Sequence, residues 1–212
     1  MNEVLWWVSR STGIVAFVLL TLALLLGILS RSGRDVAGVG RYGLLELHHT
    51  AALTALGLLA VHVVTVVLDS VAGVSTLAAL VPFTSGYAPV WVGLGVLATY
   101  GVLVGSATGL LRGRLSPRGF AVVHALTLLA WPLAALHFLG AGTDGRAPWA
   151  LGLVAACTAL LVVALGWRLT PGVRSRGHRR IPRRPGRSGA AARGPVPVAV
   201  RPLRRTPGGV PR

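Results

Sequence analysis

Five apolar stretches, each long enough to cross a bilayer, constrain the fold of this chain more than any other feature. They cover residues 4–29, 43–68, 89–111, 119–141 and 148–169, and a helix needs about 20 apolar residues to span the hydrocarbon core. The first is too long for the core of a signal peptide and has no basic residues before it, so we interpret it as a retained helix. The pattern predicts an all-α membrane protein built as a five-span transmembrane helical bundle.

Positive charge gathers at the end of the chain. The net charge is +16 with only 12% charged residues, about half of what a soluble domain carries. Twelve arginines fall after residue 172. We therefore divide the chain into a transmembrane domain, 1–171, and a disordered Arg/Pro-rich tail, 172–212. This distribution argues against a nucleic-acid partner and favours contact with anionic membrane lipid, at about 1 kcal/mol per arginine near the surface.

Arginines in the connecting loops indicate the orientation. The loops on one side of the membrane carry Arg31, Arg34 and Arg41 in 30–42, and Arg112, Arg114 and Arg118 in 112–118. On the other side, the loop 69–88 has an aspartate and no base. The positive-inside rule then predicts an integral plasma-membrane protein with its N-terminus outside and its tail in the cytoplasm. Within the outer loop, "VSTLAALVPF" can form a short helix on the membrane face.

Four histidines occur at related spacings within two of the predicted spans. His48 and His62 are fourteen residues apart, and His124 and His137 are thirteen apart. Each spacing corresponds to roughly 20 Å along a helix. The two spans run in the same direction, so His48 can face His124 near the cytoplasm and His62 can face His137 near the outer surface. Two opposed pairs of imidazoles inside a helical bundle are what two bis-histidine haems require.

His124 and His137 can both face the other histidine helix only if their own helix departs from regular geometry. Thirteen residues in an ideal helix leave the two rings roughly 140° out of phase. Pro132 lies between His124 and His137, and proline kinks a helix because it lacks an N–H. We expect a kink with local unwinding to re-aim the rings. His49, about 100° around the helix from His48, is predicted to be a bystander.

Two other functional classes stay open on these residues. A proton or metal transporter uses intramembrane histidines as a relay. Such a relay would need carboxylates inside the bundle, and the spans have almost none at depth. A non-catalytic membrane assembly protein would only pack its histidines between helices.

The histidine pattern, H-x13-H on one helix and H-x12-H on a second parallel helix, resembles the ferric reductase-like transmembrane domain. This is the haem-carrying membrane part of ferric reductases and NADPH oxidases, shared by the membrane subunit of the bacterial periplasmic methionine sulfoxide reductase system. The likeness extends over about residues 4–169 and includes "WWVSRSTGIVAFVLLTLALLLGIL" and "LVPFTSGYAPVWVGLGVLATYG". The family usually has six spans, and the first of these is missing from the pattern here.

The resemblance implies a site and a function. His48, His62, His124 and His137 would be the axial ligands of two b-type haems, and Arg10 resembles an arginine beside the outer haem. Snorkelling to the outer surface is an equal alternative for Arg10. The implied protein is an oxidoreductase membrane subunit without its own flavin and NAD(P)H domain, since no G-x-G-x-x-G follows a strand. Electrons would come from a separate flavoprotein or other cytoplasmic donor. They would leave to a ferric chelate, oxygen or an extracytoplasmic flavoprotein.

Overall fold

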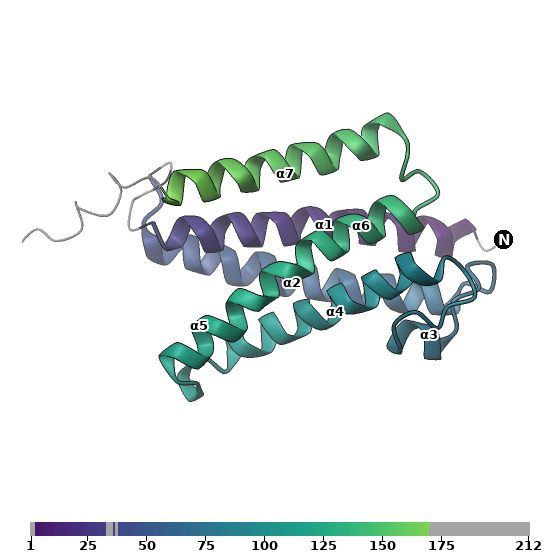
Figure 1. Ribbon diagram of the computed structural model, residues 1–212, viewed down its shortest axis with the longest axis horizontal. Helices are drawn as coiled ribbons and strands as arrows, with labels where there is room; N and C mark the ends of the chain where they lie inside the picture. The colour runs from purple at the N-terminus through teal and green to yellow at the C-terminus, as the bar shows by residue number, and fades with distance from the viewer. Residues whose placement is uncertain (1–2, 33–35, 37, 170–212) are drawn as a thin grey trace, which may run out of the picture. The chain divides into compact units, whose positions relative to one another are not determined.

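The computed structural model describes residues 3–32, 36 and 38–169 as helices joined by short connections (Figure 1). The long helices are α1 (Glu3–Ser30), α2 (Arg41–Leu68), α4 (Pro89–Leu110), the pair α5 (Pro117–Leu126) and α6 (Ala130–Ala141), and α7 (Pro148–Leu169). Five segments are long and apolar enough to cross a membrane, with α5 and α6 together forming the fourth. The described residues contain no named strand. The five-span all-α prediction is therefore confirmed, while the predicted tail at 172–212 lies outside the described residues.

The bundle is organised around two helical hairpins. Helix α1 packs along α2, and α4 packs along α6, with α7 against α1 and α6 (Figure 1). Glycines of α4 allow a close approach to the fourth span: a Cβ at Gly101 would meet Ala130 at the start of α6, and one at Gly105 would meet Thr127 just before it. Trp131 of α6 donates a hydrogen bond of 2.8 Å to Thr21 of α1, which joins the two hairpins.

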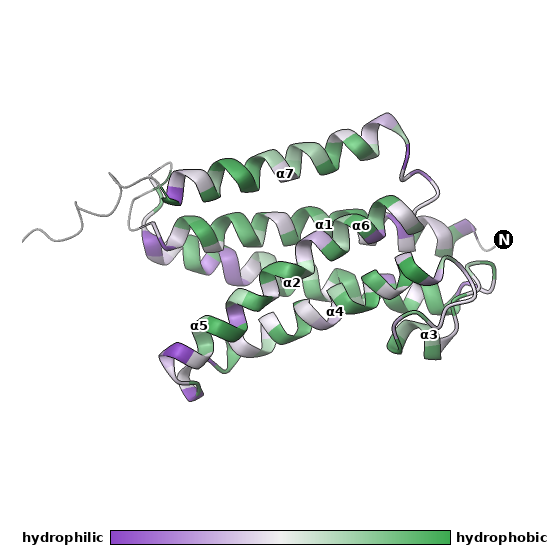
Figure 2. Ribbon diagram, in the orientation of Figure 1, coloured by the Kyte–Doolittle hydropathy of each residue, from purple (hydrophilic) through white to green (hydrophobic). Residues whose placement is uncertain are grey.

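Most of the outward helical surface is apolar. Figure 2 shows hydrophobic residues along the length of the helices and hydrophilic residues mainly towards their ends. The buried core is limited to small clusters at helix contacts, one of which contains Phe17, Ala135 and Cys157. Large hydrophobic side chains that are exposed in the isolated chain, such as Val163 at 70%, suit lipid contact in a membrane domain.

Two short features of the connections follow from local sequence, and the first was predicted above. The connection between α2 and α4 contains the predicted short helix, α3 (Thr76–Leu80), whose N-cap Ser75 accepts a hydrogen bond from the N–H of Ala78. Helix α5 begins at Pro117, and the side chain of Ser116 caps it by accepting from the N–H of Gly119. Proline suits this first position because the N–H groups of the first turn have no acceptor within the helix, so the absence of an N–H costs no hydrogen bond.

The expected unwinding between His124 and His137 is wrong. Residues Thr127–Leu129 form a 3-10 turn between α5 and α6, which is wound more tightly than an α-helix. Pro132 explains the position of this turn, because it offers no N–H to the carbonyl of Leu128, four residues before it. Three residues at about 120° each, in place of 100°, add roughly 60° of rotation relative to a regular α-helix. The turn therefore recovers part of the phase difference by overwinding.

Candidate cofactor-binding site

The structure brings the four histidines together as two pairs, each with one ring from each hairpin. The His48 and His124 ring centroids are 6.1 Å apart with planes at 74°. The His62 and His137 centroids are 6.3 Å apart at 80°. An imidazole nitrogen lies about 2 Å from a bound metal and roughly 1 Å from its own ring centre. Two imidazoles on opposite sides of one metal would therefore have centroids about 6 Å apart.

Each histidine Nδ1 has a hydrogen-bonding partner on the preceding helix of its hairpin. Nδ1 of His48 lies 2.7 Å from the carbonyl of Ala23, and Nδ1 of His62 lies 2.7 Å from that of Ser9. Nδ1 of His137 lies 2.8 Å from the carbonyl of Trp91. A carbonyl only accepts, so these three rings carry their hydrogen on Nδ1. The lone pair is then on Nε2, the nitrogen a metal ligand would use.

Glycine faces the histidine rings on the neighbouring helices. A Cβ at Gly13 would lie 2.9 Å from Nδ1 of His62, and one at Gly27 would lie 3.3 Å from Cε1 of His48. These glycines are fourteen residues apart on α1, the same spacing as the two histidines on the antiparallel α2. On α4, a Cβ at Gly95 would overlap the His137 ring even more. The rings therefore lie in grooves left open by glycine, which are closed to a Cβ at Gly13 and Gly95 and tight for one at Gly27.

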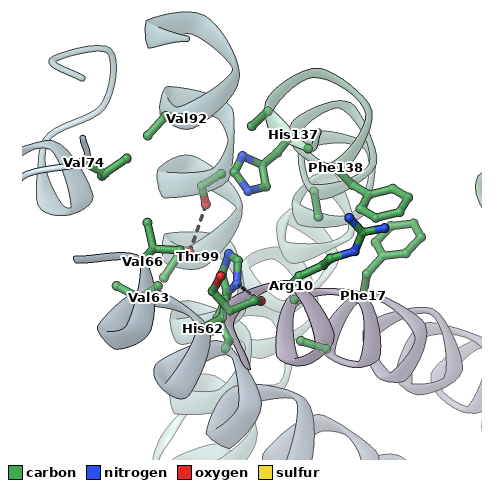
Figure 3. A pocket seen from close by; sticks show the side chains of 18 of the residues that line it. Arg10, Phe17, His62, Val63, Val66, Val74, Val92, Thr99, His137 and Phe138 are labelled. Atoms are coloured by element: carbon green, nitrogen blue, oxygen red, sulfur yellow. Dashed lines mark hydrogen bonds between the residues drawn. The ribbon is translucent and has the colours of Figure 1, made fainter. Parts of the chain in front are cut away.

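A cavity of about 550 Å³ adjoins His62 and His137, the outer pair on the predicted orientation. This volume is within the range of about 300–1,000 Å³ typical of ligand pockets. Helices α1, α2, α4 and α6 and the α2–α4 connection all contribute to its lining. Figure 3 shows the two rings turned into the cavity, between valines on one side and Arg10, Phe17 and Phe138 on the other. The cavity is mainly apolar, as expected for a site within a membrane domain.

The inner pair, His48 and His124, has different surroundings. Phe120 stacks on the His124 ring with centroids 4.9 Å apart and planes at 15°. The guanidinium of Arg112 lies 4.9 Å from the centre of the Phe120 ring. Thr108 places its hydroxyl 3.2 Å from Nδ1 of His124. Exposed arginines therefore lie close to the cytoplasmic-side pair on the predicted orientation.

Arg10 lines the outer cavity and also has a partner outside it. Its guanidinium forms an ion pair with Asp144 and lies 3.4 Å from the hydroxyl of Thr143, both in the α6–α7 connection. It lies 5.0 Å from the centre of the Trp6 ring and 5.6 Å from that of Trp149. Arg10 is therefore held at the edge of the cavity by a carboxylate and two indoles.

His49 lies beside the inner pair but does not join it. Its ring centroid is 5.8 Å from that of His48, and its side chain is exposed. The described residues contain no group of three or more His, Cys, Asp or Glu side chains able to hold a metal ion. Each pair therefore offers two protein ligands.

Sequence reasoning missed the groups that hold the rings. Three of the Nδ1 partners are backbone carbonyls, which leave no trace in a sequence. The glycines do leave one, because Gly13 and Gly27 repeat the His48–His62 spacing on the preceding span. Asp144, the partner of Arg10, was visible only as a loop residue.

Comparison with known proteins gives one family. The model of the family described as "ferric reductase like transmembrane component" matches residues 12–135, more than half of the 212-residue chain. The match contains His48, His62 and His124 and ends two residues before His137. No curated protein and no solved structure was found to match the chain.

Proposed function

Because the chain belongs to the ferric reductase-like transmembrane family, we propose that this integral membrane protein is a di-haem b-type electron-transfer protein. His48 and His124 would hold the inner haem, and His62 and His137 the outer one. The direction runs from a cytoplasmic donor, a separate flavoprotein or other reductant, to an extracytoplasmic acceptor. The acceptor is a ferric chelate, oxygen or a flavoprotein.

The single observation that carries this proposal is the geometry of the two pairs. Centroid separations of 6.1 and 6.3 Å suit two imidazoles on one metal. A bare metal ion in a protein usually needs four or more protein or water ligands. A porphyrin supplies four nitrogens itself, so two histidines complete the coordination of a haem iron. Two-histidine sites therefore fit haem better than a free cation.

The protein's residues would orient the ligands and enclose the site. Carbonyls at Ser9, Ala23 and Trp91 fix the ring tautomers, and hydrogen bonds at Nδ1 raise the basicity of the ligand. Glycines leave space beside the rings, and the apolar cavity wall excludes water from the outer pair. When bound, two haems at these depths would supply the redox centres that carry electrons across the membrane.

A proton or metal transporter is less well supported. Among the described residues, the carboxylates of Glu3, Asp69 and Asp144 lie at helix ends or in connections, and Glu46 is exposed near the start of α2. No carboxylate of the described residues lies between the two histidine pairs along α2 or α5–α6. An intramembrane relay would need such groups.

Absorption spectra and haem content of the purified protein test the proposal. The wild type should bind two haems with low-spin reduced spectra. His62→Ala and His137→Ala should lose the same haem, and His48→Ala and His124→Ala the other, because either change breaks one pair. Since the pairs are roughly 20 Å apart along the helices, the second haem should largely remain.

His49→Ala is the matched control, because it removes the imidazole next to His48 without touching either pair. It should retain both haems. A wild-type protein without haem despite ample haem supply would reject the proposal. Equal haem retention in all four pair variants would return these histidines to a structural role.

A further inference from the structure

His124 is held differently from the other three histidines. Their Nδ1 atoms contact backbone carbonyls, which no substitution removes directly. His124 has the backbone of Gly105 as a hydrogen-bonding neighbour, and its Nδ1 also contacts a side chain, the hydroxyl of Thr108, at 3.2 Å. Thr108 belongs to α4, which packs against α5 and α6. The side-chain hydrogen bond to this member of the inner pair can therefore be removed by mutation, while the backbone of Gly105 stays in place.

The hydroxyl of Thr108 must accept in this contact. Its own hydrogen points to the carbonyls of Val104 and Gly105 in the preceding turn, at 2.8 and 2.9 Å. A hydroxyl has one hydrogen and two lone pairs, so a lone pair remains for His124. His124 then carries its hydrogen on Nδ1 and its lone pair on Nε2, as the other three histidines do. Thr108 as a whole residue is only 9% exposed, so water is a poor substitute.

A second side chain fixes the plane of the same ring. Phe120, one turn before His124 on α5, stacks on it at 4.9 Å with nearly parallel planes. Arg112 lies 4.9 Å from the centre of the Phe120 ring and has an exposed side chain. His124 is therefore restrained at its Nδ1 edge by Thr108 and on one face by Phe120.

We propose that Thr108 and Phe120 are positioning residues that set the orientation and donor strength of His124, and through it the reduction potential of the inner haem. This inference rests on the proposed function. A hydrogen bond at Nδ1 makes the imidazole a stronger donor, and outer partners of this kind tune the metal. A weaker donor stabilises ferric iron less, so loss of the Thr108 contact should raise the potential.

Thr108→Val tests the hydrogen bond with little change in shape. We expect an upward shift in the midpoint potential of one haem in a redox titration of the purified protein, with the other unchanged. The low-temperature EPR signal of the same haem should shift, because ring orientation affects a low-spin ferric centre. Thr108→Ser keeps the hydroxyl and should restore both values. Thr158→Val is the matched control, since Thr158 makes the same bond to the carbonyl four residues before it at 2.7 Å on α7.

Phe120→Leu tests the ring contact separately. It keeps an apolar side chain but removes the stack, so we expect a broader EPR signal or partial loss of the same haem. Phe120→Tyr preserves the stack and should behave as the wild type. Loss of the inner haem alone in Thr108→Val, with full content in Thr108→Ser, would also support the positioning role.

The failures of the two proposals are distinguishable. If the wild type holds two haems and Thr108→Val leaves both potentials and EPR signals unchanged, the positioning role is wrong and the proposed function stands. Equal changes at both haems, or the same change in Thr158→Val, would also overturn the positioning role. A wild-type protein that binds no haem would contradict the proposed function, and the positioning role would then be wrong as well.

Discussion

Three glycines adjoin histidine rings at places where any larger residue would need the ring to move. A Cβ at Gly95 meets the His137 ring more closely than one at Gly27 meets His48, and Gly13 is intermediate. Because core packing adjusts only partly to an added methyl, the effect of substitution should follow this order. Helix propensity alone would favour alanine at all three positions.

Gly95→Ala should displace His137 and reduce the content of the outer haem, while the inner haem remains. The added methyl meets the ring itself and not a flexible chain end, so the conflict is not easily relieved. Gly109→Ala on the same helix is the control, because a Cβ there has no neighbour within 4 Å. The measurement is the haem content and the reduced spectrum of Gly95→Ala, compared with those of Gly109→Ala. Full outer-haem content in Gly95→Ala would mean that the ring needs no groove.

At the scale of the element, the fourth span sets the depth and phase of two rings at once. Its 3-10 turn at Thr127–Leu129 lies between His124 and His137. Without that turn, the two rings would leave the helix in directions further apart. The fourth span therefore departs from regular α-helical geometry at the segment that sets the relative directions of His124 and His137.

Pro132→Ala should allow this span to become a continuous α-helix. The change would turn His124 relative to His137 by roughly 60°, so one of the two haems should be lost while the protein still inserts in the membrane. Pro148→Ala, at the start of α7, which carries no histidine, serves as the control. Haem content per membrane-extracted protein is the measurement. Two haems in Pro132→Ala would show that the turn does not govern the pairing.

The sequence predicted these elements unevenly, for physical reasons. The lengths of the apolar stretches predicted the bounds of the five spans to within a few residues, because a helix that crosses lipid needs both apolar side chains and a minimum length. The spacings of 14 and 13 residues predicted which rings meet. Overwinding before Pro132 was missed, since a missing N–H removes a bond without specifying which turn replaces it. The role of Thr108 was missed because it depends on the packing of α4 against α5.

For the whole molecule, the orientation in the membrane remains a prediction from loop arginines. Cys157 is the only cysteine and is buried, so Cys157→Ala gives a background for labelling. A membrane-impermeant maleimide should label Ser70→Cys, in the outer connection, in intact cells. Gly113→Cys, in the α4–α5 connection, should be labelled only after permeabilisation. The reverse pattern would invert the topology and the proposed direction of electron flow.

Each histidine pair takes one ring from the α1–α2 hairpin and one from the α4–α6 hairpin. On the proposed function, a haem is then also a cross-link between two halves of the chain that otherwise meet through few contacts. A ligand that binds only the assembled form stabilises it by mass action. Newly made protein would therefore stay loosely joined until haem arrives, and membrane proteases would remove it first when haem is scarce. The supply of the cofactor would set the lifetime of the protein.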